Sequence, residues 1–358
     1  MKIGILSIYL HTNYGGILQA YALQTYLKKM GHDAIIIDGG QYANYLPFGN
    51  CLRIVRWILV EVKKGRWPNL YECPLFNNHK LKPFINKNMK LMKYHKIKDI
   101  KSENFDAIIV GSDQVWRKYG HIKDMAYYYL DFTSDWSIKR ISYAASFGNA
   151  DWLYNADETN RCSQMLEKFS GISVREFEGK VLCKKYLHAE AEVVIDPTLL
   201  FLKEHYLEFC QDSKLCSHDF LTYILDKDEN KNKSLSILEG ILGEKSYEIN
   251  RVDILGQKPS IESWLTCFRN AKFIFTDSFH GCVFSIIFNK PFIVYSNPTR
   301  GTSRFKTLLN LLDLQERMVY NPTEIEAVYN KNIDWNLVNN KLELLRIQAK
   351  EFLIKSLS

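Results

Sequence analysis

Short apolar runs alternate along the chain with longer segments whose apolar residues recur at helical spacing. The run KIGILS at 2–7 has the length and composition of a buried strand. After a polar stretch, apolar residues from Ile17 to Met30 recur mostly every two to four positions, and Gly31 marks the predicted end of this helix. The run AIIID at 34–38 predicts the next strand. The chain is therefore predicted to open with a strand, a helix and a second strand, joined by a right-handed crossover.

The same alternation continues through the chain. Helical patterns lie between several of the apolar runs. One of these predicted helices covers 260–271, and Ser260 is its predicted N-cap. Strands that alternate with helices favour parallel sheets covered by helices on both faces. The further strand-like runs fall at 106–116, 141–148, 192–200, 220–225, 272–276 and 291–295.

Two α/β units are predicted, because the pattern restarts after about residue 170, where GISVREFEGKVLCKKY reads as strand, turn and helix. We expect a first Rossmann-like domain over 1–168, a second over 169–325 and an amphipathic C-terminal helix within 326–358. Such folds bind ligands beyond the carboxyl ends of their strands, so a cleft between the two domains is the expected site.

Positive charge is concentrated in one segment of the first domain. The whole chain has a net charge of +7, whereas the insertion at 51–104 contains 13 Lys and Arg against four acidic residues. Within it, RIVRWILVEVKKGRW at 53–67 places a short apolar stretch between basic residues. This pattern fits a segment that lies on an anionic membrane surface, and it also fits a solvated basic face over a buried helix.

Neither a secretory leader nor a membrane span is predicted. The N-terminus lacks a basic region followed by a long apolar one, and no stretch approaches the ~20 apolar residues that a span needs. The eight cysteines are scattered without a CxxC pair, which argues against a zinc site. We therefore expect a cytoplasmic protein with reduced thiols.

The sequence TDSFHG at 276–281 stands where a strand-like run gives way to an apolar helical run. The first N–H groups of a helix lack intrahelical partners and the dipole is positive there, so this turn suits a phosphate or carboxylate. Gly281 would let a ligand approach the backbone, Ser278 offers a hydroxyl, and His280 offers a proton or a hydrogen bond. In the alternative interpretation, Asp277 or Ser278 only caps the helix, and His280 packs between the sheets.

Two other strand ends carry polar residues that suit a sugar. HTNYGG at 11–16 is interpreted either as a tight turn capped by Asn13 or as a substrate loop, and it lacks the full GxGxxG motif of a nicotinamide site. VGSDQVW, at the end of the 106–116 run, brings hydroxyl, carboxylate and amide groups that suit vicinal sugar hydroxyls. The candidate acceptor-binding residues are Asn13, Tyr14, Gly15, Gln19, Ser112 and Gln114, with Asp113 beside them as a candidate base.

Arginines follow two more predicted strands. Arg175 and Glu176 lie in SVRE, and Arg300 and Arg304 lie in RGTSRF after the last strand. The planar fork of arginine binds two oxygens at once, which suits a phosphate or carboxylate. A salt-bridged structural arginine is the alternative interpretation. No GxSxG, Walker A or HExxH motif occurs.

Seven of these segments occur in a familiar order: NYGGILQAYALQ, VGSDQVW, YAASFG, SVRE, IDPTLL, DSFHGCVFSIIFNKPF and RGTSRF. Together they resemble the polysaccharide pyruvyl transferase family over roughly residues 3–315. The resemblance implies transfer of a pyruvyl group from phosphoenolpyruvate to a sugar of a bacterial surface polysaccharide, usually as a cyclic ketal. It also implies a fold like that of the two-Rossmann GT-B glycosyltransferases, with the active site in the cleft.

The resemblance also implies roles for individual residues. The key histidine of the family matches His280, while the arginine that better-known members have two positions earlier is replaced here by Ser278. We expect His280 to be the acid or the phosphate partner, and Asp113 or Glu176 to assist the attacking hydroxyl. Arg304 is the preferred replacement for the missing arginine. The expected phosphoenolpyruvate-binding residues are Ser278, Gly281, Arg304, Arg175 and Arg300.

The implied reaction needs no metal, and phosphoenolpyruvate is a co-substrate rather than a cofactor. Several members of the family work on lipid-linked precursors at the cytoplasmic membrane. A sugar acceptor linked to undecaprenyl diphosphate would therefore explain the basic segment 51–104 as a peripheral membrane contact. We expect no nucleic-acid partner.

Two other functions stay open on the sequence alone. A nucleotide-sugar-dependent GT-B glycosyltransferase fits the architecture, although no carboxylate suited to a ribose stands between Phe279 and Asp313. A non-catalytic capsule-assembly protein is the second, although a scaffold would not need His280 and Arg304. Release of phosphate from phosphoenolpyruvate, as opposed to release of a nucleotide, separates the transferases.

Overall fold

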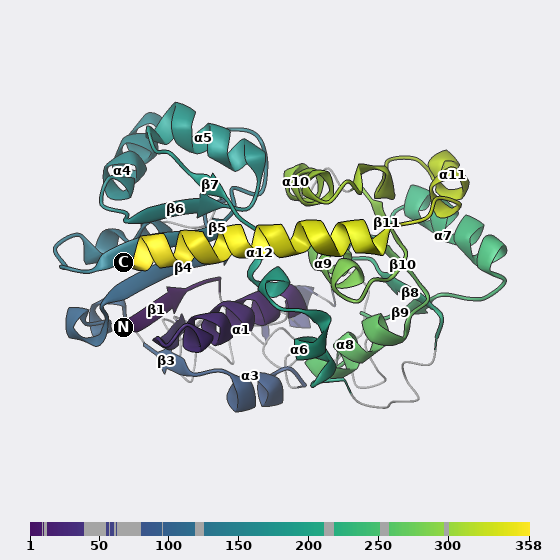
Figure 1. Ribbon diagram of the computed structural model, residues 1–358, viewed down its shortest axis with the longest axis horizontal. Coiled ribbons are helices and arrows are strands. Elements are labelled where there is room, and N and C mark those ends of the chain that lie inside the picture. The colour runs from purple at the N-terminus through teal and green to yellow at the C-terminus, as the bar shows by residue number, and fades with distance from the viewer. Residues whose placement is uncertain are drawn as a thin grey trace.

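Two parallel sheets lie side by side in the protein, each flanked by helices (Figure 1). The arrangement comes from a computed structural model. The structure describes residues 1–8, 10, 13–38, 55–56, 58–60, 62, 80–94, 96–118, 125–210, 218–250, 258–296 and 301–358.

The first sheet has seven strands in the order β3-β2-β1-β4-β5-β6-β7, and every neighbouring pair is parallel. Successive side chains of a strand point to opposite faces, and in β4 Ile108 and Ile109 accordingly belong to different buried clusters. The chain order reverses between β1 and β4, so ligands are expected beyond the carboxyl ends of these two strands. The strands are β1 Lys2–Leu6, β2 Asp33–Asp38, β3 Leu91–Lys93, β4 Ala107–Asp113, β5 Lys139–Ala145, β6 Gly171–Val174 and β7 Glu192–Val193.

The second sheet has five strands in the order β12-β11-β10-β8-β9, again all parallel. Its order reverses between β8 and β10, and the TDSFHG turn leaves the carboxyl end of β10. The turn therefore stands at the second sheet's own switch point. The strands are β8 Phe220–Tyr223, β9 Tyr247–Glu248, β10 Phe273–Thr276, β11 Phe292–Tyr295 and β12 Met318–Val319.

The boundary between the two units differs from the predicted one at 168/169. Strands β6 and β7 extend the first sheet, with Ile141 of β5 opposite Gly171 of β6. A strand–turn–helix pattern identifies a strand but not the sheet that it joins, so the sequence assigned this segment to the wrong unit. The residues over 171–193 belong with the first sheet, and the second sheet begins at β8.

Helices account for most of the remaining described residues. The predicted cap at Ser260 is present, because the side-chain oxygen of Ser260 accepts a hydrogen bond from the N–H of Ser263 at 3.2 Å. The helices are α1 Tyr14–Lys29, α3 Lys82–Asn88, α4 Ala156–Leu166, α5 Phe177–Leu187, α6 Lys203–Leu207, α7 Glu229–Leu242, α8 Ile261–Asn270, α9 Phe279–Ile287, α10 Ser303–Leu311, α11 Ile325–Tyr329 and α12 Trp335–Leu357.

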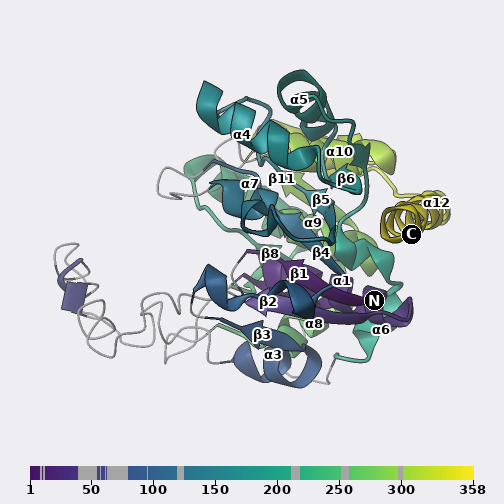
Figure 2. The same ribbon diagram turned by 90° about the vertical axis from the view of Figure 1, so that its left-hand side faces the viewer.

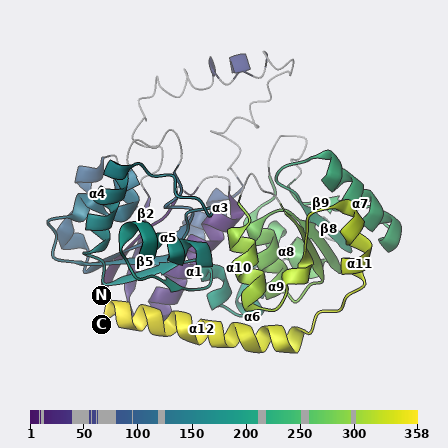
Figure 3. The same cartoon turned by 90° about the horizontal axis from the view of Figure 1, so that it is seen from above.

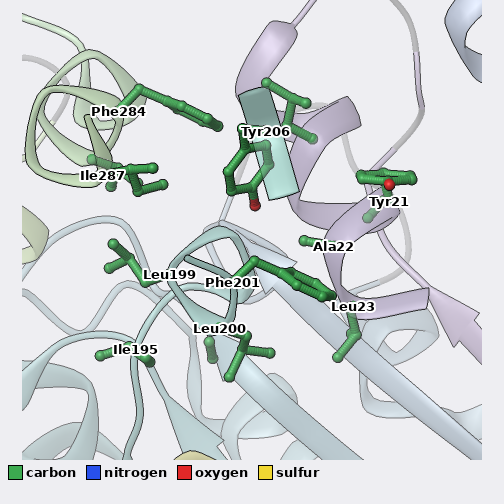
Figure 4. Close-up of a cluster of buried hydrophobic side chains, with 14 of the residues drawn as sticks. Tyr21, Ala22, Leu23, Ile195, Leu199, Leu200, Phe201, Tyr206, Phe284 and Ile287 are labelled. Carbon is green, nitrogen blue, oxygen red and sulfur yellow. The ribbon is translucent and has the colours of Figure 1, made fainter. Parts of the chain in front are cut away.

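One continuous apolar core joins the two sheets. Its members come from α1 on one side, from α8 and α9 on the other, and from the segment between β7 and α6. Figure 4 shows this segment, with Leu199 and Phe201, lying between α1 and α9. The ring of Tyr206 contacts that of Phe284 edge-on, at 5.1 Å between centroids. The shared core fixes the two sheets relative to one another, which matters because the candidate residues come from both.

Helix α12 runs along one side of both units (Figures 1 and 3). Over the first sheet, Phe352 packs against Tyr143 with 6.3 Å between ring centroids. Near the middle of the helix, Arg346 donates a hydrogen bond to the carbonyl of Leu199 at 2.8 Å. The predicted C-terminal amphipathic helix is therefore present, and it contacts the first sheet and the connecting segment.

The thiols differ from the prediction in one place. Cys267, on α8, is disulfide-bonded, whereas the sequence analysis expected reduced thiols. Scattered spacing carries no information about which cysteines approach one another in the fold. Cys162, Cys183, Cys210 and Cys282 are free.

Candidate functional site

His280 lies where the first turns of two helices meet, one from each sheet. It belongs to the first turn of α9 and is 6% exposed. Gly15, in the first turn of α1, approaches it so closely that a Cβ on this glycine would stand 1.9 Å from His280 Nδ1. Only glycine fits this approach without displacing the ring. The first unit thus forms one wall of the histidine pocket through its backbone.

Asp196 stands at the other edge of the imidazole. Its Oδ2 lies 3.6 Å from His280 Nε2, while its Oδ1 accepts hydrogen bonds from the N–H and the hydroxyl of Thr198. Burial acts to raise the pKa of the Asp196 carboxyl, but His280 and Arg175 outweigh burial and hold that pKa well below its ordinary value. Asp196 is therefore ionised, and it lies close to His280 Nε2, which is buried and has no hydrogen-bond partner within the described residues.

Arg175 connects this carboxylate to residues of the first sheet. Its Nη1 donates to Asp196 Oδ2 at 2.8 Å and to Gln19 Oε1 at 3.3 Å, and its Nη2 lies 3.6 Å from Asp113 Oδ1. The side chain of Arg175 is 2% exposed, so this is a buried network rather than a surface ion pair. Burial lowers the pKa of Arg175, but Asp196 and Asp113 more than compensate and raise it. The hydroxyl of Ser112 lies 3.5 Å from Asp196 Oδ2.

Arg304 lies near Arg175, because both arginines approach the ring of Phe279. The guanidinium of Arg175 lies 4.5 Å from the centroid of the Phe279 ring, and that of Arg304 lies 5.6 Å from it. The neighbouring His280 ring meets Phe279 edge-on at 5.3 Å. Two cations thus share one aromatic ring next to the histidine in a water-poor setting.

Glu176 lies beside these arginines but faces a different loop. Its Oε1 accepts from the hydroxyl of Ser146 and the N–H of Phe147, both at 2.8 Å, and from the N–H of Gly148 at 3.3 Å. Burial raises the pKa of Glu176, and the nearby Arg175 only partly opposes this effect. These contacts hold the turn after β5 in place. Its other oxygen, Oε2, is buried and has no hydrogen-bond partner within the described residues.

The predicted acceptor-binding residues divide into two groups. Ser112 and Gln19 are fully buried in the network around Asp196, and Gly15 forms the wall of the histidine pocket. Tyr14 instead stacks on Trp264 at 5.4 Å, with its hydroxyl donating to the carbonyl of Pro259. Its role is to hold the two units together, a role that its helical position in the sequence does not reveal.

Asn13 and Gln114 are the remaining predicted acceptor-binding residues. Asn13 is exposed and precedes α1, but its side chain makes no capping hydrogen bond, so the structure does not show the cap that one of the two interpretations of HTNYGG expected. Gln114 Oε1 accepts from Arg117 Nη1 at 2.8 Å, close to Gly148. These two residues stay candidates for the acceptor side of the site.

The TDSFHG turn combines a structural and a chemical role. The hydroxyl of Ser278 accepts a hydrogen bond from the N–H of Gly281, so Ser278 caps α9, as the alternative interpretation held. A Cβ on Gly281 would stand 2.2 Å from the hydroxyl of Thr276, so this glycine is needed for packing against β10 rather than for ligand approach. Asp277 forms a buried ion pair with Lys231 at 2.9 Å. His280 nevertheless lies in a polar network, not in packed hydrocarbon.

Some predictions lie outside the described residues, and one site residue was missed. Arg300 and part of the basic segment 51–104, including all of 63–79, fall outside the part of the chain that the structure describes. Asp196 was not singled out, although IDPTLL places a carboxylate directly after a strand, which is the position that identified Asp113. Strand β7 is only two residues long, so its end carried a weaker signal.

Within the described ranges, no group of three or more His, Cys, Asp or Glu residues is placed to hold a metal ion. Within the same ranges, none of the helices has the length and apolar character required to cross a bilayer.

Comparisons with known proteins agree with the fold and the motifs. Among solved structures, the UDP-N-acetylglucosamine 2-epimerase from Rickettsia bellii is similar at 12% identity and a TM-score of 0.50, covering 99% of this chain and 96% of that one. The UDP-GlcNAc 2-epimerase from Neisseria meningitidis bound to UDP-GlcNAc matches at 11% identity and a TM-score of 0.50, covering 99% of both chains. At such identities the likeness concerns the fold alone, and it confirms the predicted GT-B-like pair of Rossmann-like units.

The family assignment has its own support. No curated protein matches the chain. The model of the family "Polysaccharide pyruvyl transferase" matches residues 13–299, which include the first turn of α1, the Asp196 segment and His280. Because this match covers most of the sequence, the chain belongs to the polysaccharide pyruvyl transferase family.

Proposed function

We propose that the protein transfers the pyruvyl group of phosphoenolpyruvate to a pair of hydroxyls on a sugar of a surface polysaccharide or its precursor, forming a pyruvate ketal. The observation that carries the proposal is His280, buried between Gly15 and Asp196 and next to two arginines that share the Phe279 ring. This arrangement suits a small substrate with two acidic groups and a reaction that begins with a proton transfer.

The reaction requires a proton at the methylene carbon of phosphoenolpyruvate. His280 supplies this proton, and positive charge develops at the adjacent carbon. One sugar hydroxyl adds there, the second displaces phosphate, and the two hydroxyl protons balance the proton taken up by carbon and the one that leaves with phosphate. Asp196 keeps the ring oriented for the transfer. We assign Arg304 to the substrate anion, because its guanidinium lies 5.6 Å from the centroid of the Phe279 ring, next to His280.

Asp113 is the better candidate for the base that assists the hydroxyl. Glu176 uses one oxygen for three donors of the turn after β5, and its other oxygen is buried. Asp113, by contrast, ends β4 at the switch point of the first sheet and connects to His280 through Arg175 and Asp196. It therefore lies on the side where the acceptor is expected.

The acceptor that we propose is lipid-linked, carried on undecaprenyl diphosphate at the inner face of the membrane. The support is the excess of basic residues over 51–104. Co-sedimentation with phosphatidylglycerol vesicles at low and high salt tests this part separately. Binding that is lost at high salt is expected, and absence of binding at low salt would remove the membrane from the proposal.

The test of the reaction is release of phosphate from phosphoenolpyruvate in the presence of nucleotide-linked and lipid-linked sugars. Substitution His280→Ala should lower the rate at least ~10²-fold, the usual contribution of one general acid. His218→Ala, which removes an exposed histidine stacked on Tyr247, is the matched control and should leave the rate unchanged. Release of a nucleotide without phosphate from phosphoenolpyruvate would favour a glycosyltransferase instead.

A further inference from the structure

An exposed apolar stripe runs along α12 on the side that faces away from the rest of the protein. Leu337, Leu344, Ile347 and Ile354 are 45%, 61%, 46% and 50% exposed. Figure 2 shows α12 nearly end-on at the outer edge of the molecule. The opposite side of the helix holds its buried residues Val338, Leu342, Ala349, Phe352, Leu353 and Ser356. The helix thus has two apolar sides, and only one of them is covered.

The stripe has the spacing of a coiled-coil seam. Starting at Leu337, alternating steps of three and four residues reach Asn340, Leu344, Ile347, Glu351 and Ile354, and all six are exposed. Positions repeated in this way form one continuous side of a helix and pack against another helix of the same pattern. The seam is apolar except for one Asn and one Glu. From Leu337 to Ile354 it extends roughly 26 Å, at about 1.5 Å per residue.

We propose that a second copy of this chain covers the stripe, with the two α12 helices antiparallel about a twofold axis. In this arrangement each Leu344 faces Ile347 of the second copy, and each Leu337 faces Ile354. Asn340 then meets Glu351, so the two polar residues of the seam pair with one another and all apolar residues meet apolar ones. The same patch of both copies forms the contact, as in most homodimers.

Charge decides between the two possible orientations. A parallel pair would place Glu351 beside its own copy within the seam, and Lys350 beside Lys355 on the flank. The antiparallel pair instead brings Glu343 next to Lys350, and Lys355 next to Asp334. Within one copy, Glu343 pairs with Arg346 at 3.1 Å, and the side chain of Glu343 is 59% exposed. Because exposed ion pairs contribute little to stability, replacing Arg346 by Lys350 of the second copy as the partner of Glu343 costs little.

A lipid surface is the other occupant that such a stripe suggests, and the polar pair argues against it. Asn340 and Glu351 interrupt the apolar stripe and would enter the acyl region without partners. Against a second copy, the amide N–H of Asn340 can donate to the carboxylate of Glu351. The proposal does not depend on the reaction proposed above, because none of these residues belongs to the histidine network.

The oligomeric state of the full-length protein tests the proposal directly. Sedimentation velocity over a wide range of concentrations should show a reversible monomer–dimer equilibrium. The double substitution Leu344→Glu and Ile347→Glu should raise the dissociation constant at least ~100-fold by placing four carboxylates in the seam. Val181→Glu is the matched control, because Val181 on α5 is 61% exposed but lies outside α12. It should leave the equilibrium unchanged.

Charge reversal and cross-linking test the orientation. Glu343→Lys or Lys350→Glu alone should weaken the dimer, and the two together should restore it. A mixture of Asn340→Cys and Glu351→Cys chains should form a disulfide-linked heterodimer, whereas Asn340→Cys alone should not link to itself. Three results would overturn the proposal. They are a monomer at all concentrations, a dimer that the Leu344→Glu/Ile347→Glu change does not weaken, and self-linking through position 340. Vesicle binding by monomers that persists at high salt and is abolished by the Leu344→Glu/Ile347→Glu change would assign the stripe to lipid and overturn the proposal as well.

Discussion

The contact between Gly15 and His280 permits a sharp test, because one methyl group is enough to break it. A Cβ added to Gly15 would stand 1.9 Å from Nδ1, 2.2 Å from Cγ and 2.5 Å from Cε1 of the imidazole. Ordinary contact begins near 3.4 Å, so either the ring or the start of α1 must move by about 1.5 Å. The ring cannot retreat freely, since Asp196 lies on its other side.

Two effects of Gly15→Ala follow from this geometry. Overpacking of a buried site costs typically ~1–3 kcal/mol, and alanine returns ~0.5–1 kcal/mol of helix propensity, so the free energy of unfolding should fall by about 1–2 kcal/mol. A misplacement of ~1 Å at a reacting group can lower a rate ~10²-fold. The variant should therefore lose about two orders of magnitude in phosphate release while remaining folded.

The assay pairs phosphate release with denaturant unfolding, and Gly16→Ala serves as the control. The three atoms nearest to a Cβ on Gly16 all belong to the side chain of the exposed Asn13, the nearest at 3.2 Å, so this variant should be as stable as the parent and should leave His280 in place. In a His280→Ala background, Gly15→Ala should no longer reduce stability, because the colliding ring is gone. Normal turnover of Gly15→Ala, or an equal stability loss in both backgrounds, would refute the assigned contact.

Three further substitutions test the buried charges. Lys231→Met should cost ~3–5 kcal/mol in unfolding free energy, because it leaves Asp277 buried without its cation, whereas Lys233→Met on the exposed face of α7 should cost less than ~0.5 kcal/mol; chemical denaturation measures both. Asp196→Asn should destabilise by about 3 kcal/mol at neutral pH. The difference from wild type should persist above pH 3.8, the ordinary pKa of the carboxyl, and vanish as the pH falls through the depressed folded pKa. Glu176 has a raised folded pKa, so its protonated form stabilises wild type at low pH, and this contribution should be lost as the pH rises from 4.5 through the folded pKa. Glu176→Gln should not show this pH-dependent loss of stability. Thermal melts at several pH values check the difference.

The sequence predicted most of the elements well because the residues that define each one are close together in the chain. Strand β10 is a short apolar run, Ser278 caps α9 through its hydroxyl, and Gly31 ends the first helix with a φ of +88°. Each of these depends on residues a few positions apart. The end of β4 was also recognised as a polar rim, and Asp113 indeed lies there.

The sequence could not predict which residues meet across the fold. Gln19 lies within the largely buried helix α1, yet it contacts Arg175 over 156 positions of chain. Tyr14 is the first residue of that helix and was interpreted as a ligand contact, but it stacks on Trp264 of the second unit. Whether a polar residue at a strand end serves a ligand or a partner depends on the relative placement of the two sheets. Local pattern does not encode that placement.

The charges around Phe279 also bear on how an anion would bind. Arg175 and Arg304 approach this ring, while Asp113 and Asp196 lie next to Arg175, so the four charges balance. Glu176, when ionised, would make the cluster net negative before histidine is counted, and an incoming dianion would meet repulsion. Its raised pKa shows that the fold already favours the proton there, and a dianion held by Arg304 would favour it further. Phosphoenolpyruvate binding should therefore take up a proton at Glu176. In calorimetry, the binding enthalpy should depend on the ionisation enthalpy of the buffer in wild type and lose that dependence, or much of it, in Glu176→Gln.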